Sequence, residues 1–281
     1  MLVDLHTHST ASDGTQPPAE LVAEAAEVGL DVVAITDHDT TSGWGEASEA
    51  AVRAGVALVP GVEVSCQAGG ISVHLLAYLH DPTWAGLVDE LDRARASRRT
   101  RAARIVAKLA VDLPITFEDV LAATPEGATL GRPHIADALV ARRLVGSRDE
   151  AFARFLHAGS PYYAVHYAPD AVRAVRLVRA AGGVPVMAHP FAGQRGYLVD
   201  DEVVAELAEA GLAGLEVNHP DHDEQARRRG LRLAAGLGLL VTGASDYHGS
   251  GKANRLGQCL TPASVLAAIE EQGHGTGVVR G

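Results

Sequence analysis

The chain has 281 residues, of which 47% are hydrophobic and 4% aromatic, so it can form one α/β barrel with a core made mainly of Ala, Val and Leu. Its net charge of −11 argues against binding long duplex nucleic acid, and no apolar run is long enough for a membrane span. The amino terminus lacks a signal-peptide pattern, so we expect a cytoplasmic protein that does not act at a membrane. Cys66 and Cys259 are too few for a disulfide framework and are expected to be buried thiols.

The first 81 residues alternate short apolar runs with amphipathic segments, which is the pattern of repeated β-α units. In chain order we expect a strand at Leu2–His6, a helix at Pro18–Val28, a strand at Asp31–Thr36, a helix at Gly45–Ala54, and strands at Ala57–Val64 and Ile71–Leu79. The pattern favours strands that are covered by helices.

Residues 82–163 break this rhythm, because they contain helical patterns and no strand pattern. The four helices are expected at Trp84–Ala110, Phe117–Ala123, Pro133–Arg143 and Arg148–His157. We therefore expect a helical insertion subdomain between the fourth and fifth strands. Its first helix carries a basic cluster, which is either a solvated helix face or an anion site. The cluster comprises Arg93, Arg95, Arg98, Arg99, Arg101, Arg104 and Lys108.

Residues 164–281 return to the alternating pattern. We expect a helix at Pro169–Ala181, a strand at Val184–Ala188, a helix at Asp201–Ala210, a strand at Ala213–Val217, a helix at Gln225–Gly236, a strand at Leu239–Gly243 and a helix at Ala263–Gln272. Together with residues 1–81, this segment predicts an α/β barrel of seven strands.

Histidines and carboxylates stand at or near the ends of the predicted strands. The candidate metal ligands are His6, His8, Asp13, His38, Glu63, His74, His189, Asp246 and His248. The carboxyl ends of parallel strands meet at one rim, so we expect these side chains to converge. Because one zinc ion takes only three or four protein ligands, nine indicate two or three ions that share carboxylates. Multinuclear sites of this kind usually perform hydrolysis.

Other polar residues near these ligands are expected to support the site and not to bind an ion. Asp37 and Asp39 flank His38 and are expected to orient neighbouring histidines or to cap the following helix. The remaining histidines are expected at the surface or in packing, with the exception of His134. It belongs to Gly131-Arg132-Pro133-His134, a predicted helix start whose free backbone N–H groups could hold an anion.

The ligand motifs, in their order along the chain, resemble the polymerase and histidinol phosphatase (PHP) superfamily of metallophosphoesterases. They are LHTHS at 5–9, SDG at 12–14, ITDHD at 35–39, GVEVS at 61–65, VHLLAY at 73–78, AHP at 188–190 and GASDYH at 243–248. The arginine-rich insertion resembles one branch, the 3',5'-nucleoside bisphosphate phosphatases and related 5'-to-3' exoribonucleases.

This resemblance implies a distorted, TIM-like β/α barrel of seven strands with a trinuclear centre. One ion would take His6, His8, Glu63 and Asp246; a second Glu63, His74 and His189; and a third Asp13, His38 and His248. Histidine and carboxylate ligands without thiolate are compatible with Mn²⁺, Fe²⁺ or Zn²⁺.

The implied reaction is hydrolysis of a phosphate ester of a small nucleotide by metal-activated hydroxide. The expected substrate is the 3'-phosphate of a 3',5'-nucleoside bisphosphate, with short 5'-phosphorylated oligoribonucleotides as a further class. Arg98, Arg101, Arg132 and His134 are the predicted substrate-binding residues, and Asp13 or His248 would transfer the proton. The alternatives are a histidinol-phosphate phosphatase or another small phosphomonoesterase, a non-catalytic metal-binding PHP module, and an amidohydrolase.

Overall fold

The computed structural model describes residues 1–281, apart from the side chain of residue 195. Its sheet contains seven strands in chain order: β1 (Val3–Asp4), β2 (Val32–Ile35), β3 (Ala57–Ala68), β4 (Ile71–Tyr78), β5 (Val184–Met187), β6 (Gly214–Asn218) and β7 (Leu240–Gly243). Beyond β1 and β7, the backbones of Thr7 and Tyr247 pair in parallel. This bridge brings the two edges of the sheet together, and the predicted distorted seven-stranded barrel is confirmed.

Strand β4 is the distortion in this barrel. It runs antiparallel to both β3 and β5, whereas the other neighbouring strands are parallel. Strand β3 continues to Ala68 instead of ending at the predicted Val64, and it joins β4 through Gly69 and Gly70. Glu63 therefore lies within β3 and not at its end. Because β4 is reversed, the first half of this strand, with His74, lies beside the end of β5.

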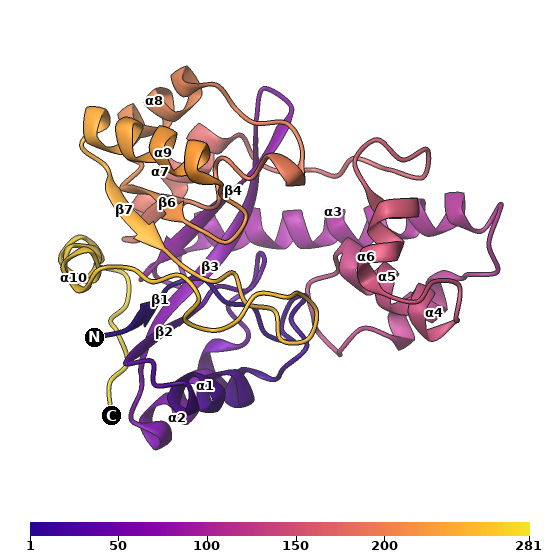
Figure 1. Cartoon of the computed structure of the whole chain (residues 1–281), viewed down its shortest axis with the longest axis horizontal. Helices are drawn as coiled ribbons and strands as arrows, with labels where there is room; N and C mark the ends of the chain where they lie inside the picture. The colour runs from indigo at the N-terminus through magenta and orange to yellow at the C-terminus, as the bar shows by residue number, and fades with distance from the viewer.

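Helices cover the outside of the barrel (Figure 1). They are α1 (Pro18–Glu27), α2 (Trp44–Ala54), α7 (Ala171–Ala180), α8 (Asp201–Glu209) and α9 (Glu224–Leu237). Outward-facing Val33 and Ile35 of β2 pack with α1 and α2 in one apolar cluster. Helix α10 (Ala263–Gln272) contributes Leu266 and Ile269 to the cluster that contains Leu76 and Val186 of the barrel strands.

The segment between β4 and α7 forms a helical lobe that projects from the barrel (Figure 1). It consists of α3 (Ala85–Leu109), α4 (Phe117–Ala122), α5 (Arg132–Ala141), α6 (Arg148–Ala151) and the π-helix η1 (Phe152–Leu156). Helix α3 has 25 residues and is therefore about 37 Å long. The lobe has its own apolar cluster, which includes Ile105, Leu109, Ile135 and Leu139.

The predicted elements agree closely with these bounds, except that β3 is longer and the last predicted helix of the insertion is divided into α6 and η1. The predicted domain limits, 82–163 for the insertion and 1–81 with 164–281 for the barrel, stay a prediction. Both cysteines are buried and unpaired, as expected. Among the described residues, no helix combines the length and the apolar character that a bilayer crossing requires.

Candidate metal centre

Glu63 lies at the centre of the histidine cluster and is 1% exposed. Its Oε1 is 2.7 Å from His74 Nδ1 and 3.0 Å from His189 Nε2. Its Oε2 is 3.4 Å from His6 Nε2, 3.1 Å from His8 Nε2 and 3.0 Å from His38 Nδ1. One buried carboxylate thus faces five imidazole rings, which suits a ligand that bridges two ions.

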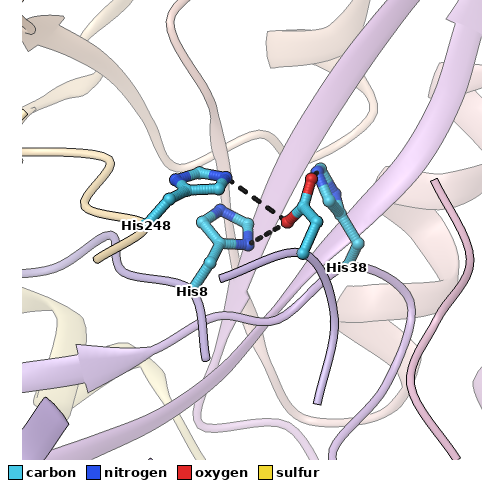
Figure 2. A group of neighbouring side chains, drawn as sticks. His8, His38 and His248 are labelled. Atoms are coloured by element: carbon cyan, nitrogen blue, oxygen red, sulfur yellow. Dashed lines mark ion pairs between the residues drawn. The ribbon is translucent and has the colours of Figure 1, made fainter. Parts of the chain in front are cut away.

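Two further carboxylates complete the cluster. Asp13 Oδ1 is 3.3 Å from His248 Nε2 and 3.6 Å from His8 Nδ1, while its Oδ2 is 3.7 Å from His38 Nε2. Figure 2 shows His8, His38 and His248 arranged around this carboxylate. Asp246 Oδ1 is 3.4 Å from His8 Nε2 and 3.5 Å from His6 Nε2.

All nine predicted ligands are brought together at this rim of the barrel. Their ligand atoms lie within 4.8 Å of one another in four overlapping groups: His8, Asp13, His38 and His248; His6, Glu63 and His189; His6, His8 and Asp246; and His38, Glu63 and His74. The groups differ in detail from the three sets implied by the family resemblance, since His8 also approaches Asp13, and His38 also approaches Glu63 and His74. Sharing of this kind is compatible with closely spaced ions.

Hydrogen bonds around the cluster orient the histidine rings so that one nitrogen of each faces the carboxylates at its centre. His6 Nδ1 donates to Glu216 Oε1 at 3.0 Å, so Nε2 faces Glu63 and Asp246 and would offer its lone pair to an ion that displaces its proton. His248 Nδ1 donates to Asp246 O at 2.8 Å, so its Nε2 lone pair faces Asp13. His38 Nδ1 is buried and lies 3.0 Å from Glu63 Oε2, but it forms no hydrogen bond among the described residues. Converging nitrogen and oxygen lone pairs fit divalent cations.

Electrostatics keeps the two buried acids ionised. Burial opposes ionisation of Glu63, but His38, His74 and His6 hold the pKa of its carboxyl well below the ordinary value. Burial likewise opposes ionisation of Asp13, whereas His38 and His248 hold the pKa of its carboxyl well below the usual range. Burial and Lys252 lower the pKa of His248 to about 3. These three groups are therefore deprotonated near neutral pH. Although burial opposes it, the surrounding carboxylates raise the pKa of His6 well above its ordinary value and that of His8 to about 9, so an ion bound there would displace protons.

Three polar residues that border the cluster were not predicted from the sequence. Glu216 is fully buried, and besides its contact with His6 it accepts the backbone N–H of His189 at 2.8 Å. Lys252 Nζ lies 2.8 Å, and His219 Nε2 lies 3.5 Å, from Asp246 Oδ2. His219 was expected at the surface or in packing. The one signal for Glu216 is an acidic residue within the apolar run Gly214–Val217.

Asp37 and Asp39 do not cap the following helix, because the N-cap residue of α2 is Gly43. Asp37 instead accepts hydrogen bonds from Ser9 N, Ser9 Oγ and Ser12 Oγ at 2.6–2.8 Å. It thereby fixes the loop that leads to Asp13. Asp39 accepts Ser65 N and Oγ, each at 2.7 Å, on strand β3.

Three arginines of the insertion lie near the metal cluster: Arg98 and Arg101 are buried, and Arg132 is half-buried. Arg98 is 7% exposed; its Nε donates to Asp39 Oδ2 at 2.7 Å and its Nη2 to Ser65 Oγ at 2.5 Å. Arg101 and Arg132 lie 5.0 and 5.7 Å from the centroid of the Tyr163 ring. Burial and the neighbouring Arg132 lower the pKa of Arg101 to about 10. Arg98 is paired with Asp39, whereas Arg101 and Arg132 donate only to the backbone carbonyls of Ala164 and Leu156 among the described hydrogen bonds and ion pairs. Cations without a carboxylate partner suit an anionic ligand.

The same cations influence His166, which was also expected in packing. Burial, followed by Arg98, Arg101, His74 and Arg132, lowers the pKa of His166 to about 2. Arg98 also bonds to Asp39, which follows the metal-cluster residue His38, and to Ser65, two residues after Glu63. The arginine cluster and the metal cluster therefore border the same region.

Two exposed basic residues of α3 bond to backbone carbonyls of the segment that follows the insertion helices. Lys108 Nζ donates to Tyr163 O at 2.6 Å, and Arg104 donates to Val165 O. His134 Nδ1 accepts the Gly131 N–H and its Nε2 donates to Ser12 O, both at 3.0 Å. Neither ring nitrogen is left for a substrate phosphate, so the predicted substrate-binding role is not kept for His134.

Comparison with known proteins agrees with this architecture. A family model described as PHP domain matches residues 4–111. The chain is 32% identical over 254 residues to a 3',5'-nucleoside bisphosphate phosphatase of Chromobacterium violaceum, covering 90% of this chain and 89% of the relative. A 5'-3' exoribonuclease of Haemophilus influenzae is 32% identical over 246 residues, covering 87% and 89%. A phosphoribosyl 1,2-cyclic phosphate 1,2-diphosphodiesterase of Eggerthella lenta is 35% identical over 258 residues, covering 89% and 95%.

A solved structure extends the similarity to three dimensions. A metal-dependent phosphoesterase from Bifidobacterium adolescentis has a TM-score of 0.94 and 43% sequence identity, covering 97% of this chain and 96% of that one. Both the barrel and the helical insertion therefore lie within the match. The chain belongs to the PHP family of metal-dependent phosphoesterases.

Proposed function

We propose that this phosphoesterase removes the 3'-phosphate from 3',5'-nucleoside bisphosphates. The observation that carries the proposal is the position of Arg98, Arg101 and Arg132 beside the metal cluster, because one phosphate can occupy the metal rim while the arginines hold another. The bisphosphate phosphatase relative supports this substrate class.

Two or three ions of Mn²⁺, Fe²⁺ or Zn²⁺ are proposed for the centre. Glu63 would bridge the ion positions, with His6, His8 and Asp246 at one, His74 and His189 at another, and Asp13, His38 and His248 at a third. When bound, such ions lower the pKa of water and neutralise negative charge on phosphoryl oxygens. The protein supplies a dry, fixed arrangement of ligands for them.

Within this centre, Asp13 and His248 are better suited to hold an ion than to donate a proton. Both are buried, and the pKa of each is lowered, so neither carries a proton to give near neutral pH. Glu216 would keep His6 in the tautomer that presents Nε2 to the ions. These roles need no covalent attachment of the phosphate to a Ser or Cys.

The arginines would select the substrate. A phosphate held by Arg98, Arg101 and Arg132 would gain charge-assisted contacts, each worth on the order of 1.5–3 kcal/mol. That corresponds to roughly 10- to 100-fold in affinity per contact. A monophosphate lacks the second anion and would lose this gain.

The proposal is tested with Arg101→Ala and Arg132→Ala on two substrates, 3'-phosphoadenosine 5'-phosphate and p-nitrophenyl phosphate. Each variant should lower kcat/KM for the bisphosphate about 10-fold or more, with little change for the aryl phosphate. The exposed neighbour Arg99→Ala serves as the matched control and should leave both values unchanged. An equal loss on the two substrates, or no loss on either, would remove the arginines from substrate recognition.

Other substrate classes become outcomes of the same assay. Short 5'-phosphorylated RNA, a ribose 1,2-cyclic phosphate and histidinol phosphate would each use the same ions. Preference for histidinol phosphate would favour a histidinol-phosphate phosphatase. Absence of turnover on every phosphate ester would favour a non-catalytic metal-binding module.

A further inference from the structure

The loop that carries Asp13 is bonded to the helical insertion at three consecutive carbonyl groups. Ala11 O accepts the backbone N–H of Thr129 at 3.0 Å, and Ser12 O accepts Nε2–H of His134 at 3.0 Å. Asp13 O accepts Nη1–H of Arg148 at 3.3 Å. The insertion therefore holds the backbone of a metal-cluster loop.

Arg148, at the start of α6, is itself fixed in orientation. Its Nε and Nη2 donate to the two carboxylate oxygens of Asp137 on α5, each at 2.6 Å. The Arg148 side chain is 15% exposed, and the bond to Asp137 raises its pKa although burial opposes this. A two-pronged bond of this kind fixes the plane of the guanidinium and directs Nη1 toward the barrel.

The same Nη1 also packs against the loop that follows His248. A Cβ atom built on Gly251 would lie 2.1 Å from Arg148 Nη1, so a side chain at this position would displace the guanidinium. The two loops are joined to each other, because Thr15 N donates to His248 O at 3.1 Å and Ser250 N donates to Thr15 Oγ1 at 2.9 Å. Arg148 thus contacts both of the loops that supply Asp13 and His248.

We infer that Arg148, held by Asp137, is a positioning residue for the ion that Asp13, His38 and His248 would bind. The inference rests on the ligand set given under the proposed function. Metal–ligand distances tolerate only about 0.2 Å of change, so loops that lose a common anchor bind that ion less tightly. Arg148 makes no contact, among the contacts described, with Glu63, His74 or His189. Binding of an ion by those three residues should therefore be unaffected.

The test is titration of metal-free protein with Mn²⁺, followed by electron paramagnetic resonance of the free ion. Four proteins are compared: wild type, Asp13→Asn, Arg148→Gln and Arg154→Gln. Wild type should show a binding step that Asp13→Asn lacks. Arg148→Gln should weaken that step about 10- to 100-fold and leave the other steps unchanged. Arg154→Gln, which removes an exposed ion pair with Glu150 in the same lobe, should match wild type.

The possible failures are distinguishable. If Asp13→Asn keeps every binding step, the ligand set of the proposed function is wrong. If Asp13→Asn loses a step but Arg148→Gln keeps it at wild-type affinity, only the positioning role is overturned. Asp137→Asn provides a second variant should Arg148→Gln not fold: it keeps the shape but removes the charge that fixes Arg148, and it should weaken the same step. Wild-type affinity in Asp137→Asn would overturn the inference.

Discussion

Glu63 is the residue on which the metal centre depends most, because its two oxygens lie 2.7–3.4 Å from nitrogens of five histidines. A buried carboxylate costs several kcal/mol unless it is paired. Imidazoles alone compensate this charge only if they are protonated, whereas divalent ions compensate it with the histidines neutral. The burial of this cluster is thus itself an argument for bound cations.

The nine candidate ligands could be predicted because they follow strand patterns at one rim, but the residues behind them could not. Glu216 looks like an ordinary acidic residue in strand β6 until the barrel places it beside His6. Lys252 lies in a loop whose path no local pattern determines. The bonds of His134 could not be predicted for a similar reason: the helix start is as predicted, but Ser12 O comes from a distant loop to accept its proton.

Buried His80 predicts part of the acid sensitivity of the fold. Its Nδ1 donates to Ala77 O at 3.1 Å, while its buried Nε2 has no hydrogen-bond partner among the described residues. Burial lowers the pKa of His80 to about 4. The pKa of His80 in the folded state lies below the unfolded value of about 6.5. The contribution of neutral His80 to the free energy of unfolding is therefore complete above pH 6.5 and is lost as the pH falls toward 4.

We therefore expect His80→Gln to reduce the loss of stability between pH 7 and pH 4 by up to about 3 kcal/mol. The measurement is the free energy of unfolding in urea at both pH values, with chelator present so that metal release does not contribute. His274→Gln changes an exposed histidine and is the control. Parallel pH profiles for wild type and His80→Gln would contradict the expectation.

At the scale of elements, the β3–β4 hairpin shows what the sequence pattern leaves out. Apolar patterns predicted both strands, but they do not indicate whether neighbouring strands are parallel or antiparallel. The antiparallel orientation of β4 was therefore not predicted. Gly69 and Gly70, with φ of 56° and 83°, form a two-residue turn between the strands. Adjacent glycines between two strand patterns are a hairpin signal, and they explain why β3 extends past Val64.

A side chain at the second position of this turn should lower the stability of the protein. A Cβ atom on Gly70 meets no neighbour within 4 Å, so Gly70→Ala tests backbone strain alone. The left-handed conformation should lower the free energy of unfolding by roughly 1–2 kcal/mol. Gly236→Ala, at an equally open position inside α9, is the matched control and should be neutral or stabilising by up to about 1 kcal/mol. Equal urea midpoints for the two variants would contradict the left-handed turn.

At the scale of the whole molecule, charge is divided between the two parts of the chain. Residues 82–163 contain 12 basic and 10 acidic residues, whereas the remainder contains 12 basic and 25 acidic. The acidic barrel suits metal cations, and the insertion contributes the arginines that suit a phosphorylated ligand. A bisphosphate placed between them would meet cations at both ends.

The most direct test of this account is the kcat/KM for phosphate release from 3'-phosphoadenosine 5'-phosphate, measured for wild type and Glu63→Ala before and after Mn²⁺ is restored to metal-free protein. Wild type should be inactive without metal and active with it, and it should prefer this substrate to AMP. Glu63→Ala should remain at least about 100-fold less active with metal, because the lost carboxylate would serve more than one ion. Metal-independent hydrolysis by wild type, or full recovery of Glu63→Ala, would contradict the shared metal centre.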